Sequence, residues 1–84
     1  MLKVDGFDEC IIGVVTLHGK EAPIIVYDAM EMIEVLVNEH DMSRSEAIEY
    51  FEYNISGAYL GESTPLYVMR CSAHTLEDLD SCLH

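Results

Sequence analysis

The residues with the clearest chemical potential are three glutamates at intervals of three, Glu46, Glu49 and Glu52, with Tyr50 and Tyr53 beside them. On a helix this spacing places the carboxylates in a stripe, which could serve acid–base catalysis, hold a cation or imitate DNA phosphates. Catalysis needs two carboxylates in one cleft with separated pKa values, and a helix face alone provides no cleft. A solvated helix face explains the same stripe, and we favour this simpler interpretation.

A second group lies near the C-terminus, where Cys71, His74, Cys82 and His84 offer thiol and imidazole ligands of the kind that zinc accepts. Only one residue separates Cys82 from His84, whereas structural zinc sites usually have wider histidine spacings or CxxC pairs. We therefore treat this group as a weak metal candidate and expect no cofactor. The three cysteines, which include Cys10, form an odd set, so we expect free thiols rather than disulfides.

Polar residues that shape the backbone form a third group: Asp28, Ser43, Asn54, Gly57 and Thr64. We expect Asn54 to hydrogen-bond the loop that contains Thr64, and orientation of a ligand is the alternative role. No nucleophile–base–orienter set and no phosphate-binding loop can be read from the sequence. The sequence therefore favours a binding protein over an enzyme.

Charge limits the choice of partners. Sixteen acidic residues face four basic ones, which gives a formal net charge of −12 at pH 7. Direct binding to nucleic acid needs a footprint of Lys and Arg that displaces counterions, and an anionic membrane surface repels such a chain for the same electrostatic reason. We expect neither, and a basic protein surface or a cation remains.

The length of 84 residues predicts a single domain, residues 1–84, with a thin core. No apolar run approaches the roughly 20 residues that span a bilayer. Residues 1–5 lack the long apolar region of a signal peptide, so we expect a cytoplasmic location.

Two β-branched runs, Ile11–Leu17 and Pro23–Tyr27, predict a β-hairpin. Both runs are apolar at nearly every position, so we expect both sheet faces to be at least partly covered. Gly13 indicates a bulge or a close backbone approach. A third strand, Leu66–Arg70, follows Pro65, which suits the edge of a sheet.

The segment from about Asp28 to Gly57 predicts a helical hairpin. Asp28 with Glu31, and Ser43 with Glu46, match capping boxes. Gly57 is expected to end the second helix in a left-handed conformation, and the short linker predicts antiparallel packing. The residues expected to face inward are Ala29, Ile33, Leu36, Val37 and His40 on the first helix, and Ala47, Ile48, Phe51, Ile55 and Ala58 on the second.

The predicted fold class is α+β, with a small, mostly antiparallel three-stranded sheet and the helical hairpin packed on one face. The element order is β-β-α-α-β, followed by a short helix in a peripheral tail, residues 71–84. Thr75 with Asp78 supplies a weaker capping box for this helix.

One block of the sequence resembles a family of small uncharacterised proteins seen in bacteriophage and bacterial genomes. The likeness covers residues 4–69 and is most specific in Asp28 and in the pattern Met42-Ser43-x-x-Glu46-Ala47-x-Glu49-Tyr50-x-Glu52-x-Asn54-x-x-Gly57-Ala58-Tyr59-x-Gly61-x-x-Thr64-Pro65. The resemblance implies a phage or prophage gene product that acts in a bacterial cytoplasm. It implies no catalytic residues, because no activity is established for that family.

We expect a small acidic protein that binds another protein, and one form of this role is an inhibitor of a host enzyme that handles nucleic acid. The candidate partner-binding residues are Glu46, Glu49, Tyr50, Glu52, Tyr53 and Tyr59. Two alternatives remain: a small enzyme or ligand-binding domain with a site at an oligomer interface, and a structural or assembly protein. Surplus apolar surface at Met30 and Met32 leaves a homodimer open.

Overall fold

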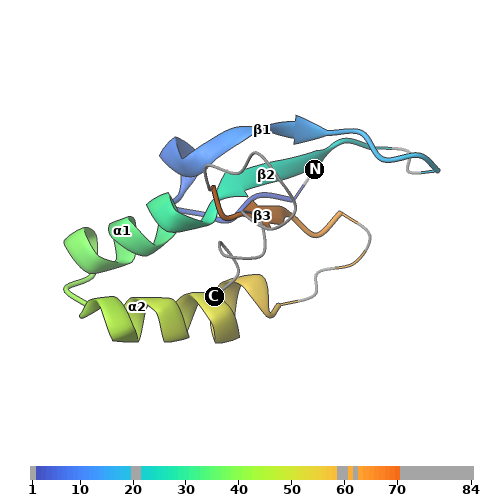
Figure 1. The fold of residues 1–84 in the computed structure, drawn as a ribbon. Helices are drawn as coiled ribbons and strands as arrows, with labels where there is room; N and C mark the ends of the chain where they lie inside the picture. Colours follow the sequence, from blue (N-terminus) through green and yellow to red (C-terminus); the bar gives the residue numbers. More distant parts are fainter. Residues whose placement is uncertain (1, 20–21, 59–60, 62, 71–84) are drawn as a thin grey trace, which may run out of the picture.

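The computed structural model describes residues 2–19, 22–58, 61 and 63–70. The elements are a 3₁₀ turn η1 (Asp8–Cys10), β1 (Ile11–Val15), β2 (Ile24–Asp28), α1 (Ala29–Glu39), α2 (Arg44–Tyr50), a π-helical turn η2 (Phe51–Ser56) and β3 (Leu66–Val68) (Figure 1). The α+β class and the order β-β-α-α-β are confirmed. The predicted C-terminal helix lies outside the described residues. No helix in the described part of the chain has the length and apolarity to cross a membrane.

The three strands form one sheet in the order β1-β2-β3. β1 pairs antiparallel with β2, whereas β2 pairs parallel with β3, so the sheet is mixed and only one of its two pairings has the expected antiparallel direction. Parallel neighbours need a crossover connection. Here α1 leads away from the sheet and α2 leads back, so β3 can run in the same direction as β2 (Figure 1).

Strand position decides how much of each strand is covered. The central strand β2 is buried at four of its five positions. On the edge strand β1 the middle residues Ile12, Gly13 and Val14 are exposed, so the expectation of covered faces is wrong for this strand. The predicted irregularity is present, because the pairing register shifts between Ile11 and Gly13. Edge positions for β1 and β3 agree with Pro65 at the start of β3.

An aromatic cluster attaches the helices to one face of the sheet. Tyr27 is fully buried on β2, and its hydroxyl accepts a hydrogen bond from the Val4 N–H at 2.8 Å. Its ring stacks on Tyr67 of β3 at a centroid distance of 5.9 Å, and Phe51 of η2 meets Tyr67 edge-on at 5.4 Å. Such geometries contribute beyond the area they bury. Ile55, one turn further along η2, belongs to the same buried core, so the hairpin packs on one face of the sheet as predicted.

The helix starts follow local rules. The Glu46 N–H donates to the Ser43 hydroxyl at 3.1 Å, and the Ser43 N–H donates to Glu46 Oε1 at 3.0 Å, which completes the capping box. The Glu31 N–H donates to Asp28 Oδ1 at 3.2 Å, so Asp28 is the predicted cap of α1. Two residues expected to face inward, Ile48 and His40, are exposed instead.

The end of the second helix differs from the prediction. Gly57 has φ −79° and ψ −10°, so it does not adopt the left-handed conformation expected of it. A glycine fits there because a Cβ atom would lie 2.5 Å from the carbonyl oxygen of Glu52. The wider π turn from Phe51 to Ser56 brings this carbonyl close to residue 57. A glycine is therefore needed at position 57 because the Glu52 carbonyl lies close to it, and not because the backbone adopts unusual dihedral angles.

Candidate functional site

The structure divides the predicted partner-binding residues among three sides of the second helix. Ala47, Phe51 and Ile55 point into the core. Glu46, Glu49 and Tyr53 lie at helical spacing on the opposite, exposed side, and we name these three residues the α2 outer surface. Tyr53 is 75% exposed, the largest value among the exposed large hydrophobic side chains of the described residues.

The remaining members of the predicted set face elsewhere. Tyr50 lines a cavity on one flank of the helix, and Glu52 lines an apolar groove on the other. The predicted stripe of three carboxylates is therefore not one continuous face. Three residues fall about 60° short of a full α-helical turn, so Glu52 lies roughly 120° around the helix from Glu46. Tyr59 lies outside the described residues.

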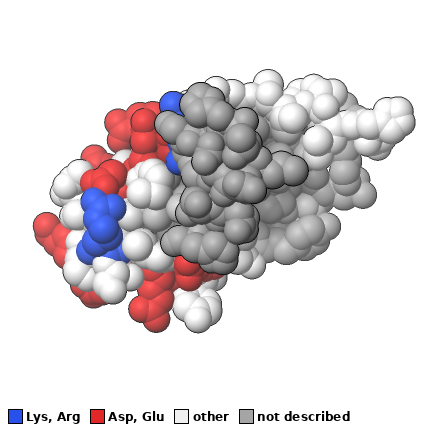
Figure 2. All heavy atoms as spheres, viewed as in Figure 1, with Lys and Arg blue, Asp and Glu red and all other residues white. Residues whose placement is uncertain are grey.

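No basic side chain neutralises the α2 outer surface within the part of the chain that the structure describes. The three described basic residues form ion pairs elsewhere: Lys3 with Asp8 at 3.3 Å, Arg70 with Asp28 at 2.9 Å, and Arg44 with Glu34. On the face shown in Figure 2, acidic side chains gather toward the helical end of the molecule, and the described residues toward the strand end show no Lys, Arg, Asp or Glu. The exposed aromatic ring of Tyr53 thus lies in a negative field.

Glu46 has a local structural role as well as a charge. Its carboxylate accepts the Ser43 N–H, and this backbone hydrogen bond, followed by the bond to the Ser43 side chain, lowers the pKa of Glu46 below its ordinary value. Glu49 makes no ion pair or side-chain hydrogen bond with any described residue. Its charge is therefore the more available of the two for a partner.

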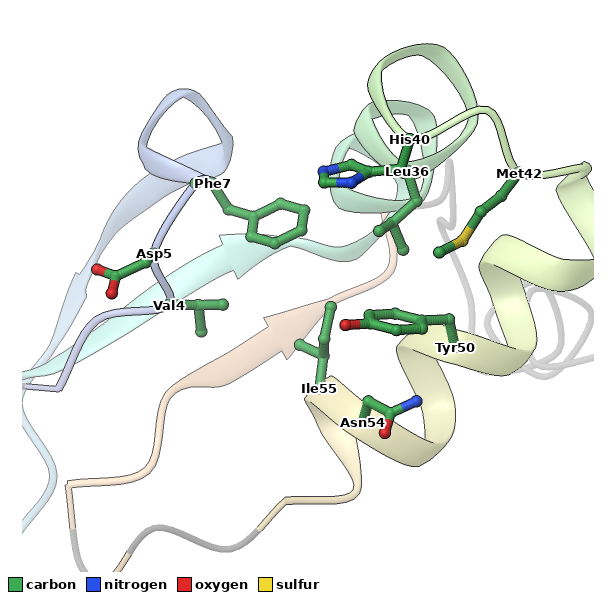
Figure 3. A pocket seen from close by; sticks show the side chains of 10 residues that line it. Val4, Asp5, Phe7, Leu36, His40, Met42, Tyr50, Asn54 and Ile55 are labelled. Carbon is green, nitrogen blue, oxygen red and sulfur yellow. The ribbon is translucent and has the colours of Figure 1, made fainter.

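A cavity of about 320 Å³ lies between the N-terminal segment, the end of α1 and the α2–η2 helix (Figure 3). Its apolar wall comes from three regions of the sequence: Val4 and Phe7, Leu36 and Met42, and Ile55. Its polar lining consists of Asp5, His40, Tyr50 and Asn54. Figure 3 shows the Tyr50 hydroxyl directed into the space between Val4 and Ile55, and the His40 ring above Phe7.

An apolar groove of about 450 Å³ lies on the other flank of the second helix. Met30 and Ile33 line it from α1, Ile48 and Phe51 from the second helix, and Met69 from the segment after β3. Met30, Ile48 and Met69 are 40%, 39% and 56% exposed. Flexible methionines at such a surface adapt well to apolar partners.

The predicted convergence of Asn54, Thr64 and a carboxylate is only partly present. Asn54 lines the cavity together with Asp5, whereas Thr64 is not among the cavity residues. The Thr64 hydroxyl donates to the Gly61 carbonyl at 2.5 Å, which orders the turn before β3. A bond from Asn54 to this loop stays a prediction, because residues 59–60 and 62 lie outside the described part.

Two chemically active groups are buried. Cys10 is 1% exposed and unpaired, and burial, with a smaller effect from Glu31, raises the pKa of its thiol to about 11. A thiol held protonated in this way is a poor nucleophile. No cluster of three or more His, Cys, Asp or Glu side chains suited to a metal occurs in the described residues. The weak zinc candidate, Cys71 with His74, Cys82 and His84, lies outside them.

Sequence reasoning missed the cavity for a physical reason. Val4 and Phe7 belong to no motif, and the N-terminal segment that carries them is held at the sheet by the hydrogen bond from the Val4 N–H to the Tyr27 hydroxyl. His40 did give a signal, since its spacing placed it on the apolar face of α1. It lies at the edge of that face and lines the cavity while staying exposed.

These features define a small α+β domain with an acidic, aromatic helix surface and a neighbouring cavity lined by both apolar and polar groups. Comparison with known protein families, with curated proteins and with solved structures gives no match.

Proposed function

We propose that this chain is a small, acidic, non-enzymatic protein that acts by binding a basic surface on another protein through the α2 outer surface. The observation that carries the proposal is the 75% exposure of Tyr53 near Glu49, whose carboxylate makes no ion pair with the described residues. Tyrosine is enriched at protein interfaces because its rigid ring buries a large area at small entropic cost. Surrounding negative charge speeds encounter with a basic partner.

One specific form of this role is inhibition of a host enzyme that handles nucleic acid, in a bacterial cell infected by a phage. The likeness to a phage and bacterial family supports this form, and so does the acidic helix, which can occupy a groove built for phosphates. The partner's own nucleic acid then competes with this chain for the groove. Such competition distinguishes this form from docking elsewhere on the partner.

The test is capture of partners from a bacterial host lysate on the immobilised chain. A partner held electrostatically should be retained at low ionic strength and released as salt rises from about 0.05 to about 0.5 M, because screening weakens exposed charge pairs. The variants Glu49→Lys and Tyr53→Ala should each fail to retain this partner. Glu9→Lys makes the same charge change on η1 and should keep it.

Retention that is unaffected by salt and by both α2 variants would refute the proposal, as would equal loss in Glu9→Lys. For the inhibitor form, a short DNA duplex added to the captured complex should elute the partner. If neither duplex DNA nor RNA elutes the partner, the chain still acts as a binding protein, but it does not imitate nucleic acid.

A homodimer is a second candidate, and the exposed groove at Met30, Ile48 and Met69 favours it. Apolar patches of this kind often mark association sites. Sedimentation velocity over a range of concentrations gives the oligomeric state. An increase in mass that Ile48→Glu abolishes and Glu49→Lys does not would assign the dimer to the groove, and a monomer at all concentrations would dismiss it.

A further inference from the structure

The cavity beside Tyr50 has the composition of a small-molecule site. Binding pockets are usually concave and mostly apolar, with a few polar groups that orient the ligand. Phe7, Leu36 and Ile55 provide a buried apolar wall here, and the cavity volume of about 320 Å³ lies at the lower end of the usual range. A ligand for this space must therefore be small and partly apolar.

The polar groups at the cavity can all accept a hydrogen bond. Tyr50 has a hydroxyl oxygen, neutral His40 has one free ring nitrogen, Asn54 has an amide oxygen and Asp5 has a carboxylate. The side chains of Tyr50, His40 and Asn54 make no hydrogen bond with the described residues. Tyr50 and His40 are the polar groups that face this space in Figure 3, and their acceptors suit a ligand that offers donors.

Charge narrows the ligand further. Among the described residues no lysine or arginine lines the cavity, and Asp5 gives its rim a negative charge. Figure 3 shows the Asp5 carboxylate turned away from the cavity centre, so it acts through its charge rather than by close contact. The net charge of −12 raises the local concentration of cations and lowers that of anions.

We infer that this cavity binds a small arylalkyl ammonium compound, an aromatic ring joined by a short chain to a protonated amine. The ring packs against Phe7 and Leu36, and the ammonium group, which has donors only, lies at the mouth near Tyr50 and His40. The ring of Tyr50 also offers a cation–π contact. This site is separate from the α2 outer surface, because neither Glu49 nor Tyr53 lines it.

The test is an NMR titration of the isotopically labelled full chain with three matched probes: 2-phenylethylammonium, the neutral 2-phenylethanol and the anionic 3-phenylpropionate. We expect saturable shifts at the amides of Phe7, Leu36, His40 and Ile55, with the ammonium compound binding most tightly and the anion most weakly. Fragments of this size bind with dissociation constants of about 0.1–10 mM.

Variants assign the contacts. Tyr50→Phe should lower the affinity for the ammonium compound and for the alcohol by about tenfold, which is the loss expected for one hydrogen bond. Tyr53→Phe removes the same hydroxyl from a residue outside the cavity and should change neither. Asp5→Asn should lower the affinity for the ammonium compound and leave that for the alcohol unchanged, because only the ammonium compound carries a positive charge.

Three results would overturn the inference. One is the absence of shifts at the cavity with all three probes. Another is equal or tighter binding of 3-phenylpropionate, which would remove the charge argument. The third is an unchanged affinity in Tyr50→Phe with the fold intact by its spectrum. Because Tyr50→Phe leaves Glu49 and Tyr53 in place, partner capture by this variant tests the docking role independently.

Discussion

Asp28 and Arg70 form an ion pair across the carboxyl ends of two parallel strands, with 2.9 Å between Asp28 Oδ2 and Arg70 Nε. Asp28 is the last residue of β2 and also the cap of α1, where its other oxygen accepts the Glu31 N–H. Arg70 lies two residues beyond the end of β3. One carboxylate thus joins the start of α1 to the last described segment of the chain.

Removal of this carboxylate should destabilise the fold. Asp28 is 4% exposed, and Asp28→Ala loses both the cap and the ion pair, so we expect a decrease of about 2–3 kcal/mol in the free energy of unfolding. Arg70→Met should cost about 1 kcal/mol or less, because the Arg70 side chain is largely exposed and its pair is screened by water.

Urea denaturation of both single variants and of the double variant gives the coupling between the two residues. Arg70→Lys, which keeps the charge but not the planar guanidinium group, is the control and should lie between the wild type and Arg70→Met. Additive single effects would show that the pair contributes nothing of its own.

Gly57→Ala should destabilise the chain by about 1–3 kcal/mol, because the added Cβ would lie 2.5 Å from the Glu52 carbonyl oxygen and the π turn would have to shift. The neighbouring exposed Ser56→Ala should change stability by no more than about 0.5 kcal/mol. Thermal or urea unfolding measures both. A neutral or stabilising Gly57→Ala would mean that the turn relaxes at no cost.

The capping box should make stability depend on pH in the acidic range. The Ser43 hydrogen bonds lower the pKa of Glu46 in the folded chain, so the folded state holds fewer protons than the unfolded state as Glu46 begins to titrate. Its contribution is present above the ordinary pKa of a glutamate and is lost as the pH falls through the lowered value. Wild type and Glu46→Gln should therefore converge in unfolding free energy at low pH.

Ser43→Ala is the complementary variant, and we expect it to cost about 1 kcal/mol at neutral pH. It should remove only part of the pH dependence assigned to Glu46, because the Ser43 hydroxyl is lost while the backbone N–H of residue 43 can still donate to the Glu46 carboxylate. If Glu46→Gln keeps the acidic pH dependence of the wild type, another carboxylate is responsible.

The Cys10 thiol should be inert in the folded protein. In a Cys71→Ser/Cys82→Ser variant it is the remaining thiol, and we expect it to react with a chromogenic disulfide reagent only as fast as the chain opens. Added urea should speed the reaction in proportion to the unfolded fraction. Reaction at the rate of a free peptide thiol at pH 8 would contradict the burial.

The raised pKa of Cys10 also predicts a loss of stability in alkali. The folded state retains the thiol proton while the unfolded state releases it, so stability from this group is full below its ordinary pKa of 9.0 and declines as the pH rises toward about 11. The steepness of this decline should be smaller in Cys10→Ala, whatever the variant's stability at neutral pH.

Local signals predicted the features that depend on neighbouring residues. The caps at Asp28 and Ser43 arise from side chains that reach backbone donors three residues ahead, so four-residue patterns suffice to predict them. The irregularity near Gly13 and the edge position of β3 follow likewise from the backbone limits of glycine and proline. The α+β class follows from the order of strand-like and helix-like periodicities.

Tertiary structure alone decided the direction of β3, the exposure of β1 and the backbone conformation of Gly57. Parallel pairing depends on where the helical hairpin returns the chain, and that is a property of the whole crossover. The π turn at Phe51–Ser56 makes room for the Glu52 carbonyl against Gly57, and no four-residue pattern predicts it. Phe7 and Tyr50 line the same cavity although they are distant in sequence. The sequence determined which chemical groups these two segments carry, and only the packing of the segments formed the cavity.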